Sequence, residues 1–319
     1  MARTVLEFEK PIHDLETKIM EMEIMSANSE VDMSGEIKRL KKKLRELAEK
    51  TNRSLTRWQR VELARHPDRP HALDLIERMT DQFIELHGDR AFGDDKSIVA
   101  GLATMGEQRL VIIGQQKGRS TKENIFRNFG MPNPEGYRKA MRIMELAQKF
   151  KMPVVTLLDT QGAYPGLGAE ERGQAEAIAR NLREMSQLTV PVIVTVIGEG
   201  ASGGALGIGV GDRLLMLENT WYSVISPEGC AAILYRDAAQ KEKAAEAMRV
   251  TARDLLEMGI ADRLIKEPLG GAHHNWDETA SSLREVLLEE MAALSALEVE
   301  VLLQNRMEKL GRMGEWEEA

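Results

Sequence analysis

The chain has 319 residues, 43% of them apolar, so it can bury one large core or two modest ones, and wholesale disorder is excluded. Its 43 basic and 51 acidic side chains give a net charge of −8, a poor balance for general nucleic-acid binding, and we expect no nucleic-acid partner. The single cysteine, Cys230, excludes an internal disulfide and any zinc site built from several cysteines of this chain.

Residues 1–10 lack the apolar stretch of a signal peptide, and no apolar run approaches the roughly 20 residues of a membrane span. We therefore expect a soluble cytoplasmic protein that does not enter a membrane. A helix is predicted over residues 5–23, a polar linker over 24–34, and a second amphipathic helix around Leu40 and Leu44.

The segment from Lys38 to Arg69 holds twelve basic and four acidic residues, a local charge of +8. This patch is either a binding site for the phosphates of a coenzyme or nucleic acid, or a solvated helix face. No aromatic residues are interleaved with it to stack bases. The histidines His66, His71 and His87, which lie in or after this segment, share no metal-ligand spacing, so we expect surface or capping roles for them.

From about residue 97, strand-like and helix-like runs alternate, which implies helices packed on a largely parallel sheet. The predicted strands are 98–103, 110–114, 154–158, 192–197, 214–217, 222–225 and 263–265. The predicted helices are 134–150 after the cap Asn133, 170–188, one from Pro227 after the cap Ser226, 241–248, 252–258 and most of 279–312. Polar or glycine-rich loops are predicted at 115–122, 159–168 and 268–278.

The strand at 192–197 leads through a turn, residues 198–202, into a small-residue helix at Gly203 and Gly204. Such a junction presents backbone N–H groups with no side chains in the way. It can therefore hold an oxygen that bears negative charge. The residues alone leave several interpretations of this junction open.

One interpretation is a dinucleotide-binding fingerprint, Gly198-x-Gly200-x-x-Gly203, with Glu218 twenty residues after the first glycine. The glycines that interrupt the following helix argue against it. A second interpretation is a serine hydrolase or thioesterase. Gly200-x-Ser202-x-Gly204 fits a nucleophile elbow, and His273 and His274 follow in the right chain order.

A third interpretation is an oxyanion hole without a nucleophile, formed where Gly203 and Gly204 let the backbone approach a carbonyl closely. Such a site suits enolate chemistry, which needs few acid–base side chains. The small residues could also simply permit close helix–sheet packing, as in a scaffold subunit without catalysis.

Several long runs resemble the carboxyltransferase alpha subunits of bacterial acetyl-CoA carboxylases. The likeness extends over essentially the whole chain, and the runs that carry it are 8–12, 127–140, 162–174, 176–185, 198–206, 223–230 and 268–273. One departure is Gln161, where the family commonly has proline. The resemblance implies an α/β, crotonase-like spiral of repeated strand–strand–helix units with an N-terminal helical arm and C-terminal helices.

The resemblance also implies the reaction, in which the carboxyl group of carboxybiotin moves to acetyl-CoA and gives malonyl-CoA for fatty acid synthesis. The carboxybiotin would be carried on a separate biotin carboxyl carrier protein and supplied by a biotin carboxylase. This chain would act with a beta subunit as α2β2, and zinc is expected only on that beta subunit.

Carried over by position, the amides of Gly203 and Gly204 would form the hole for the ureido oxygen of biotin, with Ala205 as a neighbouring donor. Gly162 and Ala163 are further candidates for substrate binding. Candidates for the coenzyme A phosphates are Lys117, Arg119 and the basic patch. The expected division of the chain is an arm for partner binding at 1–85, a carboxyltransferase core at 86–268 and a C-terminal part at 269–319.

Overall fold

The protein is built around one mixed β-sheet, which is seen in a computed structural model that describes residues 4–28 and 33–314. The strands run in the order β1-β2-β3-β4-β5-β6-β8, and β7 pairs with the end of β5. The first two pairings are antiparallel and the others are parallel. The bounds are β1 Gln82–Glu85, β2 Ile98–Met105, β3 Gln108–Gln115, β4 Val154–Thr160, β5 Val192–Ala201, β6 Arg213–Leu217, β7 Trp221–Ser223 and β8 Arg263–Ile265.

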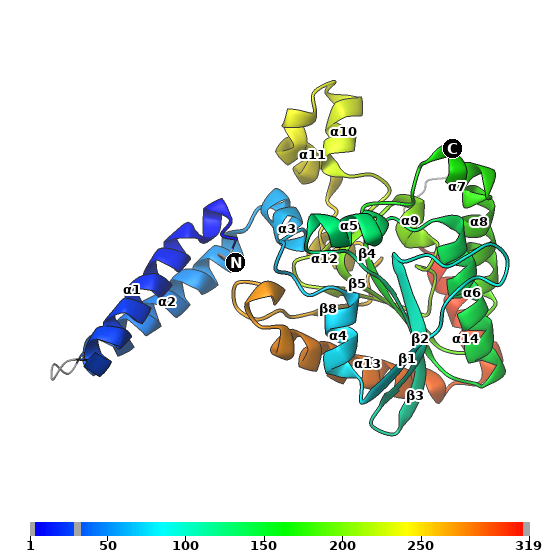
Figure 1. The fold of residues 1–319 in the computed structure, drawn as a ribbon, viewed down its shortest axis with the longest axis horizontal. Helices are drawn as coiled ribbons and strands as arrows, with labels where there is room; N and C mark the ends of the chain where they lie inside the picture. The colour runs from blue at the N-terminus through cyan, green and yellow to red at the C-terminus, as the bar shows by residue number, and fades with distance from the viewer. Residues whose placement is uncertain (1–3, 29–32, 315–319) are drawn as a thin grey trace.

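Helices surround the sheet and extend beyond it (Figure 1). Their bounds are α1 Lys10–Asn28, α2 Ser34–Ser54, α3 Arg57–Ala64, α4 Ala72–Met79, α5 Thr121–Phe126, α6 Pro134–Lys149, α7 Leu167–Glu171, α8 Gln174–Ser186, α9 Ser202–Leu206, α10 Pro227–Leu234, α11 Lys241–Met248, α12 Ala252–Glu257, α13 Trp276–Ser295 and α14 Val299–Gly311. Short 3₁₀ turns lie at Glu7–Glu9, Asn128–Gly130, Ala238–Gln240 and Ala272–His274. None of the helices in the described ranges is both long and apolar enough to cross a bilayer.

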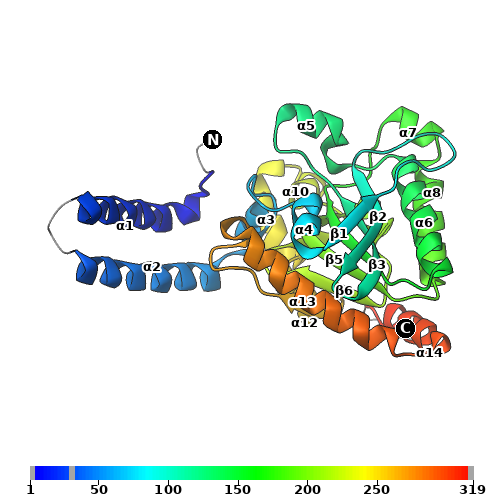
Figure 2. The ribbon, with the colours of Figure 1, turned by 60° about the horizontal axis from the view of Figure 1, so that its bottom comes forward.

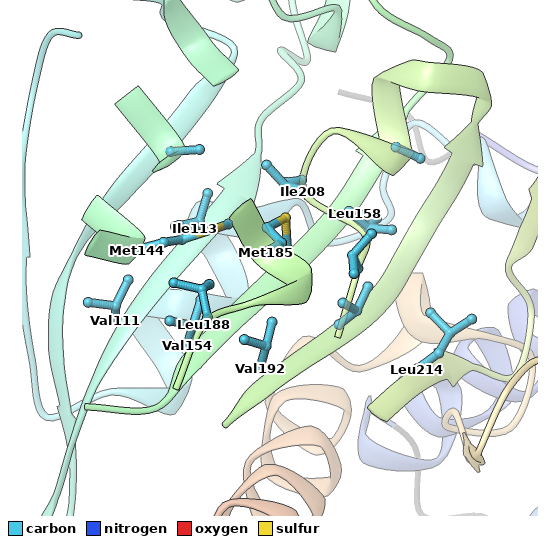
Figure 3. Close-up of a cluster of buried hydrophobic side chains, with 14 of the residues drawn as sticks. Val111, Ile113, Met144, Val154, Leu158, Met185, Leu188, Val192, Ile208 and Leu214 are labelled. Carbon is cyan, nitrogen blue, oxygen red and sulfur yellow. The ribbon is translucent and has the colours of Figure 1, made fainter. Parts of the chain in front are cut away.

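Both faces of the sheet are buried, because successive side chains of a strand point to opposite faces. In β3, Val111 and Ile113 join the cluster under α6 and α8, whereas Leu110 and Ile112 join the cluster under α4 and α13. Figure 3 shows the first of these clusters, with side chains from several strands meeting Met185. Strands buried on both faces explain the nearly continuous apolar runs in the sequence.

The N-terminal hairpin of α1 and α2 projects away from the sheet in both views (Figures 1 and 2). Ile19 and Leu40 are buried in this hairpin, with 5% and 7% of their surfaces exposed. Other parts of residues 1–85 belong to the body of the molecule. Helix α4 lies in the second core cluster and β1 pairs with β2.

The predicted strands are confirmed, with small shifts at their ends, but three element predictions are wrong. The helix expected at 170–188 is two helices, α7 and α8, because Gly173 at φ +82° interrupts it. The strand expected to end at residue 197 continues to Ala201, because β7 pairs with its last residues. The linker expected at 24–34 is helical up to Asn28, and its residues 29–32 lie outside the described part.

Candidate functional site

Four helices gather at the edge of the sheet where the parallel strands end. Helices α5, α7, α9 and α10 follow β3, β4, β5 and β7 respectively, so all four begin at the carboxyl ends of strands (Figure 1). In open α/β sheets, ligands bind at this edge. The candidate junction between β5 and α9 lies here.

The junction is a sharp strand-to-helix turn at Ser202, whose backbone adopts the left-handed conformation with φ +56°. Helix α9 starts at this residue and contains Gly203, Gly204 and Ala205. The first N–H groups of a helix have no partner within it. The N–H groups of Gly203 and Gly204 are therefore available, whereas the N–H of Ala205 is the first to be bonded inside the helix, to the carbonyl of the cap Ala201.

A close backbone contact holds this junction against the loop after β4. A Cβ atom added at Gly204 would lie 2.3 Å from the carbonyl carbon of Gly162 and 2.4 Å from the nitrogen of Ala163. Gly203 has more room, since the nearest atom to an added Cβ is the Cδ1 of Ile178 at 3.6 Å. The structure thus brings four predicted site residues together, and it requires glycine at position 204 for a steric reason.

The C-terminal end of α9 is held in place by α6 and α8. The Asn181 side chain of α8 donates to the carbonyl of Gly207 at 2.8 Å and to that of Tyr137 at 3.0 Å. A Cβ at Gly207 would lie 2.4 Å from the Tyr137 ring. This packing fixes the short helix in place.

A charged network lies next to this junction and joins the buried carboxylates of Asp159 and Glu199 to the partly exposed Lys117. The Lys117 ammonium lies 2.7 Å from the Asp159 carboxylate and 3.7 Å from that of Glu199. Burial disfavours the charge on Lys117, but attraction from both carboxylates outweighs it and raises the pKa of the ammonium. Burial likewise opposes ionisation of Asp159, but Lys117 and a bond from His71 hold its pKa well below the ordinary value.

Sequence reasoning did not single out Asp159 and Glu199 as members of the site. Asp159 directly follows the apolar run 154–158, and polar residues in that position collect at the carboxyl edge of a sheet, so a signal was present. Glu199 is 4% exposed inside β5 and also pairs with Arg65. Nothing in the local sequence distinguishes that buried carboxylate from a turn residue.

Arg119, the other candidate for phosphates, lies apart from this network. Its guanidinium is 2.6 Å from the Asp74 carboxylate and sits over the Trp276 ring at 4.6 Å. About a third of the side chain remains exposed. The structure therefore does not bring Arg119 together with Lys117.

Much of the basic patch is used inside the chain. Arginines in its second half make ion pairs or hydrogen bonds with distant residues, namely Arg57 with Asp254, Arg60 with Asn219, Arg65 with Glu228 and Arg69 with Glu267. In α2, by contrast, the side chains of Lys42 and Arg45 are about four-fifths exposed. The interpretation of the patch as a solvated helix face therefore fits α2. The arginines of its second half instead bond α3 and the segment after it to the core.

The expectation of surface or capping roles holds for His71, which is the N-cap residue of α4, but it is wrong for His66, as is the loop-surface alternative for His273. Both are buried, their rings stack at 3.9 Å, and His273 bonds to Glu9 at 2.9 Å. Ligating atoms of these three residues lie within 4.8 Å of one another, close enough to be tested as a metal site. However, both ring nitrogens of His66 already bond to backbone, to the Asp68 N–H and the Thr4 carbonyl. The cluster therefore ties the N-terminal segment to the core.

The two short-motif interpretations of the junction do not match this geometry. Gly198 and Gly200 lie inside β5 rather than in a phosphate loop, and Glu218 pairs with Arg253. Within the described residues the Ser202 hydroxyl bonds to no histidine, and His273 bonds to Glu9 instead. Neither a dinucleotide fingerprint nor a serine–histidine pair is assembled here.

Comparison with known proteins gives one consistent family. The family model described as "Acetyl co-enzyme A carboxylase carboxyltransferase-like" matches residues 5–314. The chain is 54% identical to a protein of Chlorobaculum parvum named acetyl-coenzyme A carboxylase carboxyl transferase subunit alpha, and the match covers 100% of this chain and 99% of that one. A protein of the same name from Geobacter metallireducens is also 54% identical, with 98% of each chain covered.

Solved structures share the fold at much lower identity. A transcarboxylase 12S structure aligns with a TM-score of 0.58 and 20% identity, covering 71% of this chain and 42% of that chain. A Pseudomonas malonate decarboxylase hetero-tetramer in complex with coenzyme A aligns with a TM-score of 0.59 and 16% identity, covering 74% and 91%. These likenesses confirm the crotonase-like α/β fold expected from the sequence.

Proposed function

The chain belongs to the acetyl-CoA carboxylase carboxyltransferase family, and we propose that it is an alpha subunit that transfers the carboxyl group of carboxybiotin to acetyl-CoA. The product is malonyl-CoA, a precursor for fatty acid synthesis. The observation that supports this best is the junction at Gly204, where the backbone of α9 packs directly against the backbone of Gly162 and Ala163. The protein is a cytoplasmic enzyme component in this proposal.

The contribution of this chain to the chemistry is electrostatic. Carboxybiotin supplies the carboxyl group, and the ureido oxygen of biotin gains negative charge as that group leaves. The amides of Gly203 and Gly204 donate hydrogen bonds to that oxygen, and the Ala205 amide that follows them is bonded inside α9. A single donor of this kind is worth about 3 kcal/mol of transition-state stabilisation. Gly162 and Ala163 form the opposing wall against which the substrate is placed.

A beta subunit completes the site in this proposal. Large apolar side chains are exposed around the carboxyl edge, on α5, α7, α10 and the segments next to them: Ile125, Phe126, Phe129, Leu167, Val224, Ile233 and Leu234. Apolar patches around a site commonly mark a protein interface. The partner would cover this edge in an α2β2 assembly and supply a second hole for the enolate of the thioester.

Further partners follow from the family. The carboxybiotin is carried on a biotin carboxyl carrier protein and is regenerated by a biotin carboxylase. Zinc belongs on the beta subunit, because this chain has one cysteine and cannot supply a multi-cysteine site. The projecting hairpin of α1 and α2 is the part of the 1–85 arm available for partner contacts. The carboxyltransferase core is 86–268, to which α4 and β1 are added, and the C-terminal part is 269–319.

The test is reconstitution with a beta subunit. The complex should carboxylate acetyl-CoA when the carrier protein and the carboxylase are present, and it should decarboxylate malonyl-CoA when free biotin is added. Neither subunit should turn over alone. Full turnover by this chain without a partner would contradict the proposal.

Two alternatives are separated by single substitutions. A scaffold subunit would tolerate Gly203→Val in an assembled complex, whereas an oxyanion hole would lose activity. A Cβ atom at Gly203 has room, since its nearest neighbour would be the Cδ1 of Ile178 at 3.6 Å. A serine hydrolase would react with a fluorophosphonate probe and lose that labelling in Ser202→Ala. The carboxyltransferase proposal expects no labelling at all.

A further inference from the structure

The side chain of Gln115 is fully buried at the end of β3 and bridges two other elements of the sheet edge. Its Nε2 donates to the carbonyl oxygen of Gly204 at 2.7 Å. Its Oε1 accepts from the backbone N–H of Asp159 at 3.0 Å. One amide thus joins α9 to the end of β4, the two walls of the proposed site.

Both bonds satisfy backbone groups at irregular points of the fold. The register between β4 and β5 shifts between Leu158 and Thr160, so Asp159 lies at the irregularity. The Gly204 carbonyl belongs to a five-residue helix, whose last carbonyls lack partners within it. The backbone N–H of Asp159 can only donate, so the side-chain oxygen of Gln115 must face Asp159. The NH₂ group of Gln115 then faces the carbonyl of Gly204.

The second donor to the same carbonyl is the hydroxyl of Tyr137, at 3.2 Å. Burial keeps the pKa of Tyr137 well above its ordinary value, so the phenol remains a donor at any physiological pH. In a trans peptide the C=O and the next N–H point in opposite directions. Two donors that hold the Gly204 carbonyl toward the core therefore fix the orientation of the Gly204–Ala205 peptide, and with it the position of the start of α9.

We propose that Gln115 is a positioning residue for the oxyanion hole, which sets the orientation of the Gly204–Ala205 peptide and its distance from the loop after β4. The role depends on the proposed function, because the hole is the site that Gln115 orients. Gln115 touches no reacting atom in this role. It acts through the backbone of α9.

The test is Gln115→Met in the reconstituted complex, because methionine keeps the volume and loses both hydrogen bonds. We expect kcat for carboxyl transfer to fall about 10- to 100-fold, the effect typical of a slightly misplaced catalytic group. The KM for acetyl-CoA should stay within about twofold of wild type, and assembly with the beta subunit should be unchanged. A purely structural role would lower stability and leave kcat per assembled complex unaltered.

The neighbouring Gln116 offers a matched control. It is also buried and makes two backbone bonds, to Leu73 and Lys117, but neither reaches α9. Gln116→Met should therefore lose stability without the selective loss of kcat. An equal loss of kcat in both variants would overturn the inference.

Tyr137→Phe gives an independent reading, since it removes only the weaker donor to Gly204 and should lower kcat about 3- to 10-fold with KM unchanged. The inference would be overturned if Tyr137→Phe keeps the wild-type kcat and Gln115→Met does so too. It would also be overturned if Tyr137→Phe keeps the wild-type kcat and Gln115→Met fails to assemble. An active wild-type complex in that experiment would leave the proposed function standing. An inactive wild-type complex would overturn both.

Discussion

The Lys117 ammonium lies 2.7 Å from the buried carboxylate of Asp159, in a network that also holds the buried side chains of His71 and Glu199. This pairing gives Lys117 a partner that a coenzyme phosphate would have to displace. Separating a buried ion pair costs several kcal/mol. The geometry therefore favours a role for Lys117 in holding the junction together over a role in binding phosphates.

Lys117→Met should destabilise the chain by about 3–5 kcal/mol, because the buried carboxylates of Asp159 and Glu199 lose the positive charge that pairs with them. If Lys117 instead contacts coenzyme A, the KM for acetyl-CoA should rise while thermal stability stays near wild type. Thermal unfolding of the chain and steady-state kinetics of the complex measure the two effects separately. Lys96→Met, which breaks a partly exposed pair with Asp94, is the matched control and should change stability by less than about 1 kcal/mol.

The sequence allowed prediction of the strands from β2 onward, the Gly203–Gly204 junction and the family, because each leaves a local pattern. The short edge strand β1 was not predicted. The buried strands appear as apolar runs, and the close approach of Gly204 to Gly162 requires residues without side chains. The break between α7 and α8 was missed. Gly173 marks it, but a glycine inside a helical pattern is compatible with either outcome.

The long-range contacts could not be predicted. Gln115 meets Gly204 across 89 positions, and Glu9 meets His273 across 264. No periodicity or spacing in the sequence encodes such a pair, because the partners come together only when the whole chain folds. The same is true of Arg69, which reads as part of a basic patch and is bonded to Glu267 in the core.

Gly203 and Gly204 should respond differently to alanine. Gly204→Ala places its Cβ against backbone atoms that have no room to move, so we expect a loss of at least about 2 kcal/mol in stability and no activity. Gly203→Ala meets only the end of Ile178 and should change stability by less than about 1 kcal/mol. In the complex, its methyl group should still lower kcat about 10-fold or more by crowding the donor. Equal stability of the two variants would contradict the packing described here.

Acid should weaken the attachment of the N-terminal segment. Burial, reinforced by the nearby His273 ring, lowers the pKa of His66 from 6.5 to about 4. Between those pH values the unfolded chain binds a proton that the folded chain does not, so stability falls as pH decreases. Lowering the pH from above 6.5 to below about 4 should decrease the free energy of unfolding by about 3 kcal/mol. Denaturant midpoints measured from pH 7.5 to 5 should show the decline.

His66→Gln should flatten that pH dependence, even if its stability at neutral pH is lower. His87→Gln is the control, since the His87 side chain is more than half exposed and lies in a surface cluster with Glu85 and Asp94. It should keep the wild-type slope. An unchanged slope in His66→Gln would show that another group governs the acid sensitivity.

The projecting hairpin should be needed for assembly rather than for folding. Met20 and Ile24 on α1 are each more than half exposed, so replacing both with glutamate removes apolar surface without opening a core. We expect the unfolding temperature to change by only a few degrees. Binding to the beta subunit or the other carboxylase components should weaken at least about 10-fold, as measured by analytical ultracentrifugation or interferometry.

Met307→Glu, on α14 at the opposite end of the molecule (Figure 2), is an equally exposed control. The same weakening in that control would show that added charge, and not the hairpin surface, is responsible.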